Sequence, residues 1–387
     1  MAQPVRIIAP MTLGRPHNNN VQSPARQKTR VGEFELIARL KAMLDEARKD
    51  TSRVAPPSPV VDIGDDAAAV RRGKLVDIYT TDTMVDGVHF RRSQIPWNDL
   101  GWKAMASNQS DIAAMGGQPL YALVTLGITA SEYAEDLEEM YRGLTAAGNK
   151  YGGQVIGGDI VRSPVLFVTI ALTGVADVPA SVAEEARAHA MNRPVRQPDV
   201  AWEAALLKRS AAQPGDLIGV TGTVGASAGG LAALDRGISG ADAQVLIRSH
   251  FRPEPRVPEG SILVRNGVLA AMDISDGLVA DMGKITRMSK VSARIELDRV
   301  PVDPALKRLF PGEWTAMALG GGEDYELLFT APPSLMRHVL PKLGRGAAVI
   351  GEVTEPASDG RQAVTVVDSH GQPVPVSHTG WDHLLEP

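Results

Sequence analysis

Residues 270–289, AAMDISDGLVADMGKITRMS, join a short apolar run to an acidic turn and then to a helical pattern. The run over 270–274 predicts a buried strand, and the segment over 277–289 predicts a helix. Asp273 and Asp276 lie between the two. The stretch therefore predicts a strand–helix unit of an α/β fold that carries carboxylates at its turn.

The same alternation of strand and helix patterns runs through the rest of the chain. Short runs of apolar and β-branched residues predict strands, which we expect over residues 60–63, 75–81, 121–128, 155–156, 165–175 and 216–221. Apolar residues three and four positions apart predict helices, which we expect from residue 34 onward and over 97–115, 132–151 and 226–234. This alternation indicates an α/β (α+β) protein rather than an all-helical or all-strand one.

Two segments interrupt the alternation and divide the chain. Residues 1–31 contain Arg and Lys but no Asp or Glu, so we expect a disordered extension, with a transit peptide as the alternative. Residues 177–207 are rich in Ala, Pro, Arg and Glu with weak periodicity, which predicts a linker or surface insertion. We therefore expect an N-terminal domain over 32–176 and a C-terminal domain over 208–387.

The composition excludes several classes of function. A chain of 387 residues, of which 44% are apolar, has material for two domains. Cysteine and the HExxH sequence are absent, which excludes disulfides, thiolate nucleophiles and the common zinc sites. No apolar run is long enough for a membrane span or a secretory signal, and a net charge of −5 argues against a nucleic-acid partner. We expect a cytoplasmic protein that binds neither membranes nor nucleic acids.

Acidic residues gather in four short segments that are rich in Gly, Ser, Thr and Ala. The segments contain Asp62, Asp65 and Asp66; Thr80, Thr81 and Asp82; Asp111 together with Gly157, Gly158 and Asp159; and Asp273, Ser275 and Asp276. Neighbouring carboxylates repel by about 1 kcal/mol at 4 Å in water and by more near a protein surface. A solvated turn explains one such pair, but four segments in one chain favour shared cations. We predict magnesium, which prefers oxygen ligands and often shares them with phosphates.

The absence of other phosphate-binding motifs supports this interpretation. The sequence contains neither a Walker GxxxxGK[ST] motif nor the HRD and DFG motifs of protein kinases. Phosphates bound by this protein would therefore be neutralised by several magnesium ions rather than by a P-loop lysine. The pattern favours metal-assisted phosphoryl transfer.

The acidic segments and their neighbours, in this order, resemble those of the thiamine-monophosphate kinases, a family of the aminoimidazole-ribonucleotide-synthetase-like (PurM-like) superfamily. The resemblance runs from residue 32 to residue 383 and is carried by IGDD at 63–66, TDTMVDGVHF at 81–90, DIAAMG at 111–116, IGGD at 156–159, DISDGL at 273–278 and GGEDYEL at 321–327. It implies a two-domain architecture in which the N-terminal domain binds ATP and magnesium. The strands of the N-terminal domain would form the interface of a homodimer, and a C-terminal α/β domain would cover the nucleotide cleft.

The resemblance also implies a reaction and its residues. The reaction is direct in-line transfer of the terminal phosphate of ATP to the phosphate of thiamine monophosphate, which yields thiamine diphosphate. The implied magnesium ligands are Asp66, Thr80, Thr81, Asp82, Asp111, Asp159, Asp273 and Asp276, of which Asp82, Asp111 and Asp159 are the catalytic group. The implied nucleotide contacts are Gly158, Asp159, Arg209 and Ser275, and the implied acceptor contacts are His89, Glu323 and Trp381. The segments before residue 32 and near 178–206 are longer than the family pattern, so we assign them no catalytic role.

Simpler interpretations exist for three of these residues. His89 beside Phe90 fits a packed core histidine, Arg209 fits a surface charge, and Trp381 fits an anchor for the C-terminal tail.

Other functions also stay open. GASAG at 225–229 matches the GxSxG pattern of serine hydrolases, with Ser227 as the nucleophile, although Ser227 does not directly follow the strand predicted over 216–221. Another ATP-dependent synthetase or kinase of the same superfamily, or a non-catalytic magnesium–nucleotide sensor, fits the acidic segments as well.

Overall fold

The computed structural model describes residues 32–49, 59–73, 75–176, 180–190, 206–357 and 360–376. Within these ranges the first half of the chain forms a five-stranded sheet and the second half a six-stranded sheet. The first half contains α1 (Glu33–Lys49), β1 (Ala68–Arg72), β2 (Leu75–Val85), α2 (Trp97–Ala114), β3 (Gly117–Ile128), α3 (Ala134–Tyr151), β4 (Gln154–Arg162), β5 (Phe167–Ala176) and α4 (Ala180–Ala190). The second half contains η2 (Arg209–Ala211), β6 (Leu217–Val220), α5 (Ala226–Asp235), α6 (Ala241–Phe251), α7 (Val257–Arg265), β7 (Ala270–Asp273), α8 (Leu278–Ser289), β8 (Ser292–Glu296), η3 (Leu297–Arg299), α9 (Pro304–Leu309), α10 (Trp314–Gly320), β9 (Leu327–Ala331), α11 (Pro333–Val339), η4 (Leu340–Lys342), β10 (Ala348–Thr354) and β11 (Val364–Val367).

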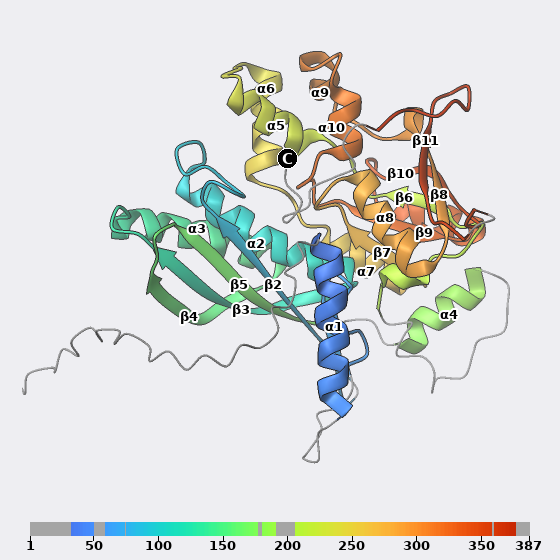
Figure 1. Cartoon of the computed structure of the whole chain (residues 1–387), viewed down its shortest axis with the longest axis horizontal. Coiled ribbons are helices and arrows are strands. Elements are labelled where there is room, and N and C mark those ends of the chain that lie inside the picture. Colours follow the sequence, from blue (N-terminus) through green and yellow to red (C-terminus); the bar gives the residue numbers. More distant parts are fainter. Residues whose placement is uncertain are drawn as a thin grey trace, which may run out of the picture.

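The N-terminal sheet has the strand order β1-β2-β5-β3-β4. β2, β5 and β3 pair antiparallel, and β4 pairs parallel with β3 at one edge. The helices α2 and α3 pack against each other and lie on one face of this sheet (Figure 1). Thr and Val residues favour the long strand β2, and alternate residues of that strand face the helices.

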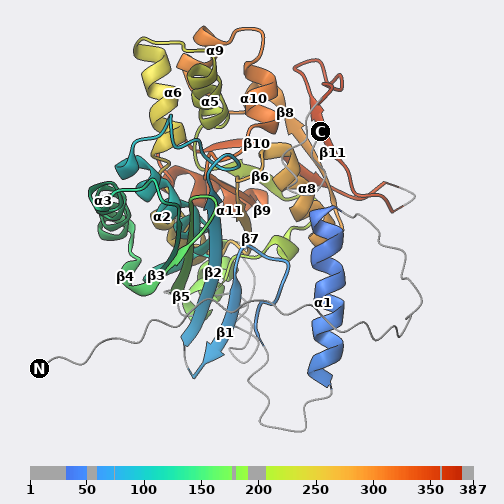
Figure 2. The ribbon, with the colours of Figure 1, turned by 60° about the vertical axis from the view of Figure 1, so that its left-hand side comes forward.

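The C-terminal sheet has the strand order β11-β8-β10-β6-β9-β7. Its neighbouring strands pair antiparallel except for β11 and β8, which are parallel. The helices α5, α6, α9 and α10 gather at one end of this half, as both ribbon views show (Figures 1 and 2). They enclose a small apolar core of their own around Leu246 and Leu306.

Helix α2 lies between the two sheets and connects their cores. It contacts β2, β3 and β5 on one side, and α7 and β7 on the other. Most of its residues are buried, including polar ones such as Lys103 and Asn108. Gly101 allows α3 to pack closely, because a Cβ at this position would lie 1.8 Å from the carbonyl oxygen of Met140. The polar residues of α2 are therefore held at the boundary between the domains.

The face of the N-terminal sheet that points away from α2 and α3 is apolar and exposed. Tyr79 and Tyr121 lie opposite each other across β5 on this outer face, and Leu123 follows on β3. Ile156 and Ile160 are exposed on the edge strand β4. Contiguous apolar surface of this kind commonly marks a protein–protein interface.

The predicted strands and helices largely match the structure, and two acidic segments differ from expectation. β2 continues past Asp82 to Val85 and pairs with β5 over this length. β4 continues through 157–159, beyond the strand predicted over 155–156, because its parallel pairing with β3 extends through Asp159. Asp82 and Asp159 therefore lie within strands, whereas Asp111 lies within α2, as the helix predicted over 97–115 implies.

Two other segments also differ from the sequence-based expectation. Residues 60–63 form isolated bridges, at Val61 with Ala69 and at Ile63 with Asp65, rather than a strand. The segment over 177–207, expected to be a linker or surface insertion, contains a helix that was not predicted, α4, which packs against α7 and α11. Its Arg187 donates a hydrogen bond to the carbonyl oxygen of Gly267 at 2.9 Å. The expected domain boundaries stay predictions, and the extension over 1–31 lies outside the described residues.

Among the helices in the described ranges, none combines the length and the apolar character that a membrane crossing requires.

Candidate active site

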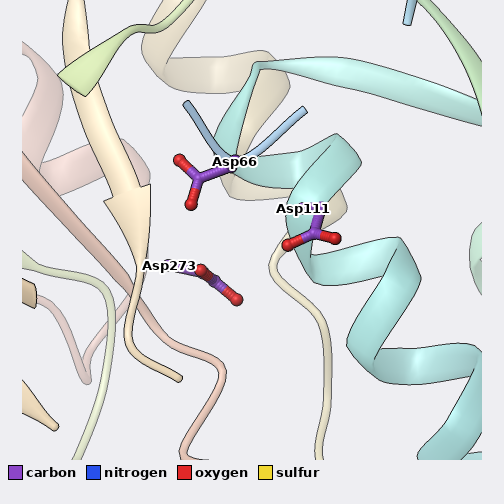
Figure 3. A group of neighbouring side chains, drawn as sticks. All are labelled: Asp66, Asp111 and Asp273. Carbon is purple, nitrogen blue, oxygen red and sulfur yellow. The ribbon is translucent and has the colours of Figure 1, made fainter. Parts of the chain in front are cut away.

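Three carboxylates from distant parts of the chain converge between the two domains. Asp66 precedes β1, Asp111 lies near the end of α2, and Asp273 is the last residue of β7. One oxygen from each carboxylate lies within 4.8 Å of the other two. Figure 3 shows the three side chains facing a common space. Among the described residues, these three form the one group of acidic or histidine side chains close enough to share a metal ion.

Neighbouring hydroxyl groups hold two of these carboxylates in place. Thr80 Oγ1 donates a hydrogen bond to Asp111 Oδ2 at 2.5 Å. Ser110 Oγ donates to Asp273 Oδ2 at 2.7 Å. One bond joins β2 to α2 and the other joins α2 to β7, so the carboxylates are positioned by the packing of the two domains.

The electrostatics of this acidic cluster (Asp66, Asp111 and Asp273) favour a bound cation. Burial raises the pKa of Asp111, and the charges of Asp82, Asp273 and Asp66 raise it further. Burial likewise raises the pKa of Asp273, with Asp66 as the next cause. Asp66 Oδ2 is buried and has no hydrogen-bond partner among the described residues. Oxygen ligands of this kind match the preference of magnesium, and a divalent cation would relieve the repulsion among the carboxylates.

Asp82 lies on β2 beside the acidic cluster. Its backbone N–H donates to Asn108 Oδ1 of α2 at 3.0 Å. Because alternate residues of a strand share a face, Asp82 and Thr80 both face α2, whereas the exposed Thr81 belongs to the outer face. Thr80 and Asp82 are therefore better placed than Thr81 to act with the cluster.

Arg209 places a fixed positive charge next to the cluster. Its guanidinium Nη2 donates to Asp66 Oδ1, and its backbone N–H lies 3.3 Å from both carboxylate oxygens of Asp65. Burial raises the pKa of Asp65 to about 6; Asp66 adds to this rise, and Arg209 opposes it. The Arg209 side chain is only 14% exposed, so its simpler interpretation as a surface charge is wrong.

The turn between β7 and α8 is held by hydrogen bonds to one buried carboxylate. Asp281 Oδ2 accepts the backbone N–H groups of Ser275, Asp276 and Gly277, each at 3.0 Å. Lys284 Nζ lies 2.6 Å from Asp276 Oδ2. The positions of Ser275 and Asp276 are therefore fixed by side chains of α8.

Glu323 lies beside the β7–α8 turn in a constrained backbone conformation, and its backbone N–H donates to the carbonyl oxygen of Ser275 at 2.8 Å. Its φ is 64°, in the left-handed region that non-glycine residues rarely adopt. Lys103 Nζ donates to Glu323 Oε2 at 2.9 Å, and His250 Nδ1 lies 3.6 Å from the same oxygen. Burial lowers the pKa of His250 to about 2, and the charge of Lys103 adds to this effect. His250 is therefore neutral in the folded protein.

The acidic cluster and most of the groups around it line one cleft of about 1060 Å³, which also contacts the first turns of α1. Typical pockets for one small ligand measure about 300–1,000 Å³. The cleft thus has room for two phosphate-bearing molecules.

Most of the residues predicted from the sequence line this cleft. They are Asp66, Thr80, Thr81, Asp82, His89, Asp111, Arg209, Asp273, Ser275, Asp276 and Glu323. His89 is oriented by the backbone N–H of Val85, which donates to its Nδ1 at 3.1 Å. Its position on the cleft and its partial exposure do not fit a packed core histidine.

Three predicted residues do not join this group. Gly158 and Asp159 lie on the edge strand β4, where Asp159 is exposed and pairs in register with Thr125. β5 and β3 separate β4 from β2, and strands are spaced about 4.8 Å apart. Asp159 is thus roughly 14 Å from Asp82 across the sheet. Trp381 lies outside the described residues.

Four residues of the site were not predicted from the sequence. These are Lys103, His250, Asp281 and Lys284. Lys103 could have been noticed in the sequence, because it is the one charged residue between Asp99 and Asp111. The other residues of this stretch are apolar, small or uncharged. Asp281 and Lys284 also had a local signal, because they pair three positions apart on α8 and contact the turn that precedes this helix. The partners of His250 depend on tertiary contacts that no local pattern reveals.

The structure also addresses Ser227 as a hydrolase nucleophile. Ser227 is buried in the first turn of α5, after the N-cap residue Gly225, and its Oγ lies 2.9 Å from His250 Nδ1. Glu323 lies near the same ring nitrogen. A catalytic triad needs its acid on the other nitrogen of the histidine, so this arrangement does not form one.

Both halves of the chain match known protein families. Residues 64–176 match the family described as AIR synthase related protein, N-terminal domain, and residues 213–363 match AIR synthase related protein, C-terminal domain. The thiamine-monophosphate kinase of Salmonella typhimurium is 37% identical over 369 residues, which span 92% of this chain and 99% of that protein.

Solved structures show the same likeness. The structure of AaThiL complexed with AMPPCP and TMP is 30% identical, with a TM-score of 0.72, over 92% of this chain and 99% of that chain. The thiamine-monophosphate kinase of Stenotrophomonas maltophilia K279a is also 30% identical, with a TM-score of 0.64, over 89% of this chain and 99% of that one.

Proposed function

This chain belongs to the thiamine-monophosphate kinase family of the AIR synthase related proteins, and we propose from this that it transfers the terminal phosphate of ATP to thiamine monophosphate. The acidic cluster of Asp66, Asp111 and Asp273, facing the cleft, is the observation that carries the proposal. A related structure contains AMPPCP and TMP together, and AMPPCP is a non-hydrolysable analogue of ATP. The product would be thiamine diphosphate.

The proposed chemistry needs charge neutralisation more than a general base. A phosphate monoester has a second pKa near 6, so the acceptor phosphate is already largely ionised at neutral pH. The obstacle is the approach of two polyanions in an in-line arrangement. Several magnesium ions, held by the acidic cluster with Asp82 and Thr80, would supply the neutralising charge.

The residues of the chain have distinct proposed roles in this reaction. Thr80 and Ser110 orient the carboxylates of Asp111 and Asp273 through their hydrogen bonds. Arg209 would bind a phosphate of the nucleotide, since its planar guanidinium suits phosphate oxygens and is held at the cluster. Ser275 belongs to the nucleotide side of the cleft.

The acceptor side of the cleft is proposed to include His89, Glu323 and Trp381. Glu323 presents its carboxylate to the cleft with 27% of the side chain exposed, while Lys103 holds one oxygen from behind. Such a fixed carboxylate suits an amino group or a cationic ring, both of which thiamine monophosphate carries. His89 is oriented towards the same cleft by the backbone of Val85.

We also propose a homodimer that forms through the outer face of the N-terminal sheet. The exposed side chains of Tyr79, Tyr121 and Leu123 on this face support the proposal. Asp159 is exposed on the adjoining edge strand, away from the cluster of its own subunit. We therefore place Asp159 and Gly158 at the cleft of the partner subunit, where they would contact the nucleotide and its metal.

One assay tests the proposed reaction. The purified chain is incubated with ATP, magnesium and thiamine monophosphate, and the products are separated by chromatography. Thiamine diphosphate should appear together with an equal amount of ADP, whereas free thiamine in place of the monophosphate should give none. Formation of ADP without thiamine diphosphate would instead indicate another phosphate acceptor within the superfamily.

A further inference from the structure

Lys284 forms an ion-paired bridge at the end of the cleft where β7 turns into α8. Its Nζ lies 2.6 Å from Asp276 Oδ2 and 2.7 Å from Asp281 Oδ1, and its side chain is 9% exposed. Asp276 and Lys284 both line the cleft, next to Ser275. An ammonium group therefore already lies where a cation bound to Asp276 would be expected.

The second carboxylate of the bridge keeps Lys284 in this position. Asp281 has no exposed side-chain surface, and its other oxygen accepts three backbone N–H groups from the turn over 275–277. Burial lowers the pKa of Lys284, but the charges of Asp281 and Asp276 outweigh this effect and the net change is upward. Moving the ammonium away would leave Asp281 as a buried charge without its counter-ion, which is strongly unfavourable.

Asp276 is also separate from the acidic cluster. Asp66, Asp111 and Asp273 come within 4.8 Å of one another, and within the described part of the chain Asp276 does not belong to that group. Its carboxylate neighbour is Asp281, and the ammonium of Lys284 lies between the two. The electrostatic reason for a divalent cation, which is strong at the cluster, is therefore weak at Asp276.

We propose that Lys284 takes the place of a divalent cation at Asp276, so that this carboxylate is not a metal ligand and the ammonium itself faces the phosphates bound in the cleft. The proposal rests on the proposed function, because it assumes that the acidic cluster binds divalent cations. It revises the role that the family resemblance implies for Asp276. It also predicts that the number of ions per subunit depends on the cluster alone.

The test counts bound ions directly. Mn²⁺ binding is measured by the electron paramagnetic resonance signal of the free ion, with AMPPCP present, for the full-length chain and for the variants Asp276→Asn, Lys284→Met and Asp276→Asn/Lys284→Met. Asp273→Asn, in the cluster, is the reference that should lose at least one ion. We expect Asp276→Asn to bind as many ions as the unmodified chain. We expect Lys284→Met to bind one more, and the double variant to lose that extra ion.

Two results would overturn the proposal. One is the loss of an ion in Asp276→Asn, which would make Asp276 a ligand despite Lys284. The other is a Lys284→Met variant that folds, as judged by circular dichroism, and gains no ion. If Lys284→Met does not fold, Asp276→Asn still decides, because it leaves the pair of Lys284 with Asp281 in place. Two other results would instead count against the proposed function. One is the absence of thiamine diphosphate in the assay, and the other is an Asp273→Asn variant that binds as many ions as the unmodified chain.

Discussion

Lys103 and Glu323 form an ion pair that joins the helix α2 to the turn between α10 and β9, with 2.9 Å between Nζ and Oε2. The lysine side chain has no exposed surface, whereas 27% of the glutamate side chain is exposed at the cleft. A buried ammonium needs a nearby counter-charge. Glu323 therefore has two roles in this account, as a proposed contact for the acceptor and as the partner that makes the burial of Lys103 tolerable.

This relationship predicts unequal effects of substitutions at the two positions. Glu323→Gln should destabilise the protein by about 3 kcal/mol or more, because it leaves Lys103 buried and unpaired. Lys103→Met should cost less, since Glu323 keeps contact with solvent. The double variant Lys103→Met/Glu323→Gln should be more stable than Glu323→Gln alone. Urea unfolding of the four proteins measures these differences, and simple addition of the two single losses would contradict the ion-pair account.

Asp111→Asn should separate activity from stability. We expect turnover to fall on the order of 100-fold or more at saturating magnesium, because electrostatic stabilisation of the transferred group is lost. The thermal midpoint of the metal-free protein should stay the same or rise, since a neutral amide removes the repulsion that raises the pKa of this buried acid. Steady-state assays and thermal unfolding test the two expectations.

The matched control is Asp242→Asn, which removes a carboxylate from the exposed ion pair with Arg308, far from the acidic residues of the cleft. It should leave turnover unchanged. Near-normal turnover of Asp111→Asn would remove the cluster from the proposed chemistry.

The position of Asp159 predicts complementation between subunits. Asp111→Asn and Asp159→Asn should each be inactive as homodimers. If Asp159 lies at the partner's cleft, a heterodimer of the two variants contains one cleft in which both aspartates are intact. This heterodimer should therefore regain activity. The measurement is turnover of heterodimers purified through two different affinity tags. Inactive heterodimers would show that Asp159 acts on its own subunit or through the fold alone.

Asp324 predicts a pH dependence of stability. Burial raises its pKa to about 7, against the opposing effect of hydrogen bonds from the backbone N–H groups of Gly225 and Ser227 at the start of α5. The folded state therefore keeps a proton that the unfolded state releases at lower pH, so this residue contributes less stability as the pH rises from about 4 to about 7.

In Asp324→Asn this contribution is absent. The single amide oxygen keeps one of the two backbone hydrogen bonds, and the loss of the other does not vary with pH. One pKa unit corresponds to about 1.4 kcal/mol. We therefore expect the variant to gain on the order of 1–3 kcal/mol relative to the unmodified chain over this pH range. Denaturant unfolding at several pH values checks this, and a difference that stays constant with pH would contradict it.

The sequence predicted the elements whose patterns are local. The helix α8 follows from the apolar spacing after Gly277, and most of β2 from its β-branched residues. The glycine pair before Asp159 resembles a turn, yet β4 continues because it pairs with β3, and such pairing has no local signature. The fold therefore departs from prediction where tertiary pairing overrides local preference.

The site shows the same division. Asp66, Asp111 and Asp273 were predicted because acidic residues beside small ones stand out in a sequence. Lys103 was missed because its partner lies 220 positions further along the chain. The partner of a residue in a long-range ion pair becomes visible only in the folded structure.

The dependence of thiamine diphosphate formation on Mg²⁺ tests the central claim most directly. The rate is measured by chromatography across a magnesium titration that begins with chelator in excess. The acidic cluster as a cation site predicts no product in chelator and a rate that rises to saturation with magnesium. Product formation at an unchanged rate in chelator would contradict the account.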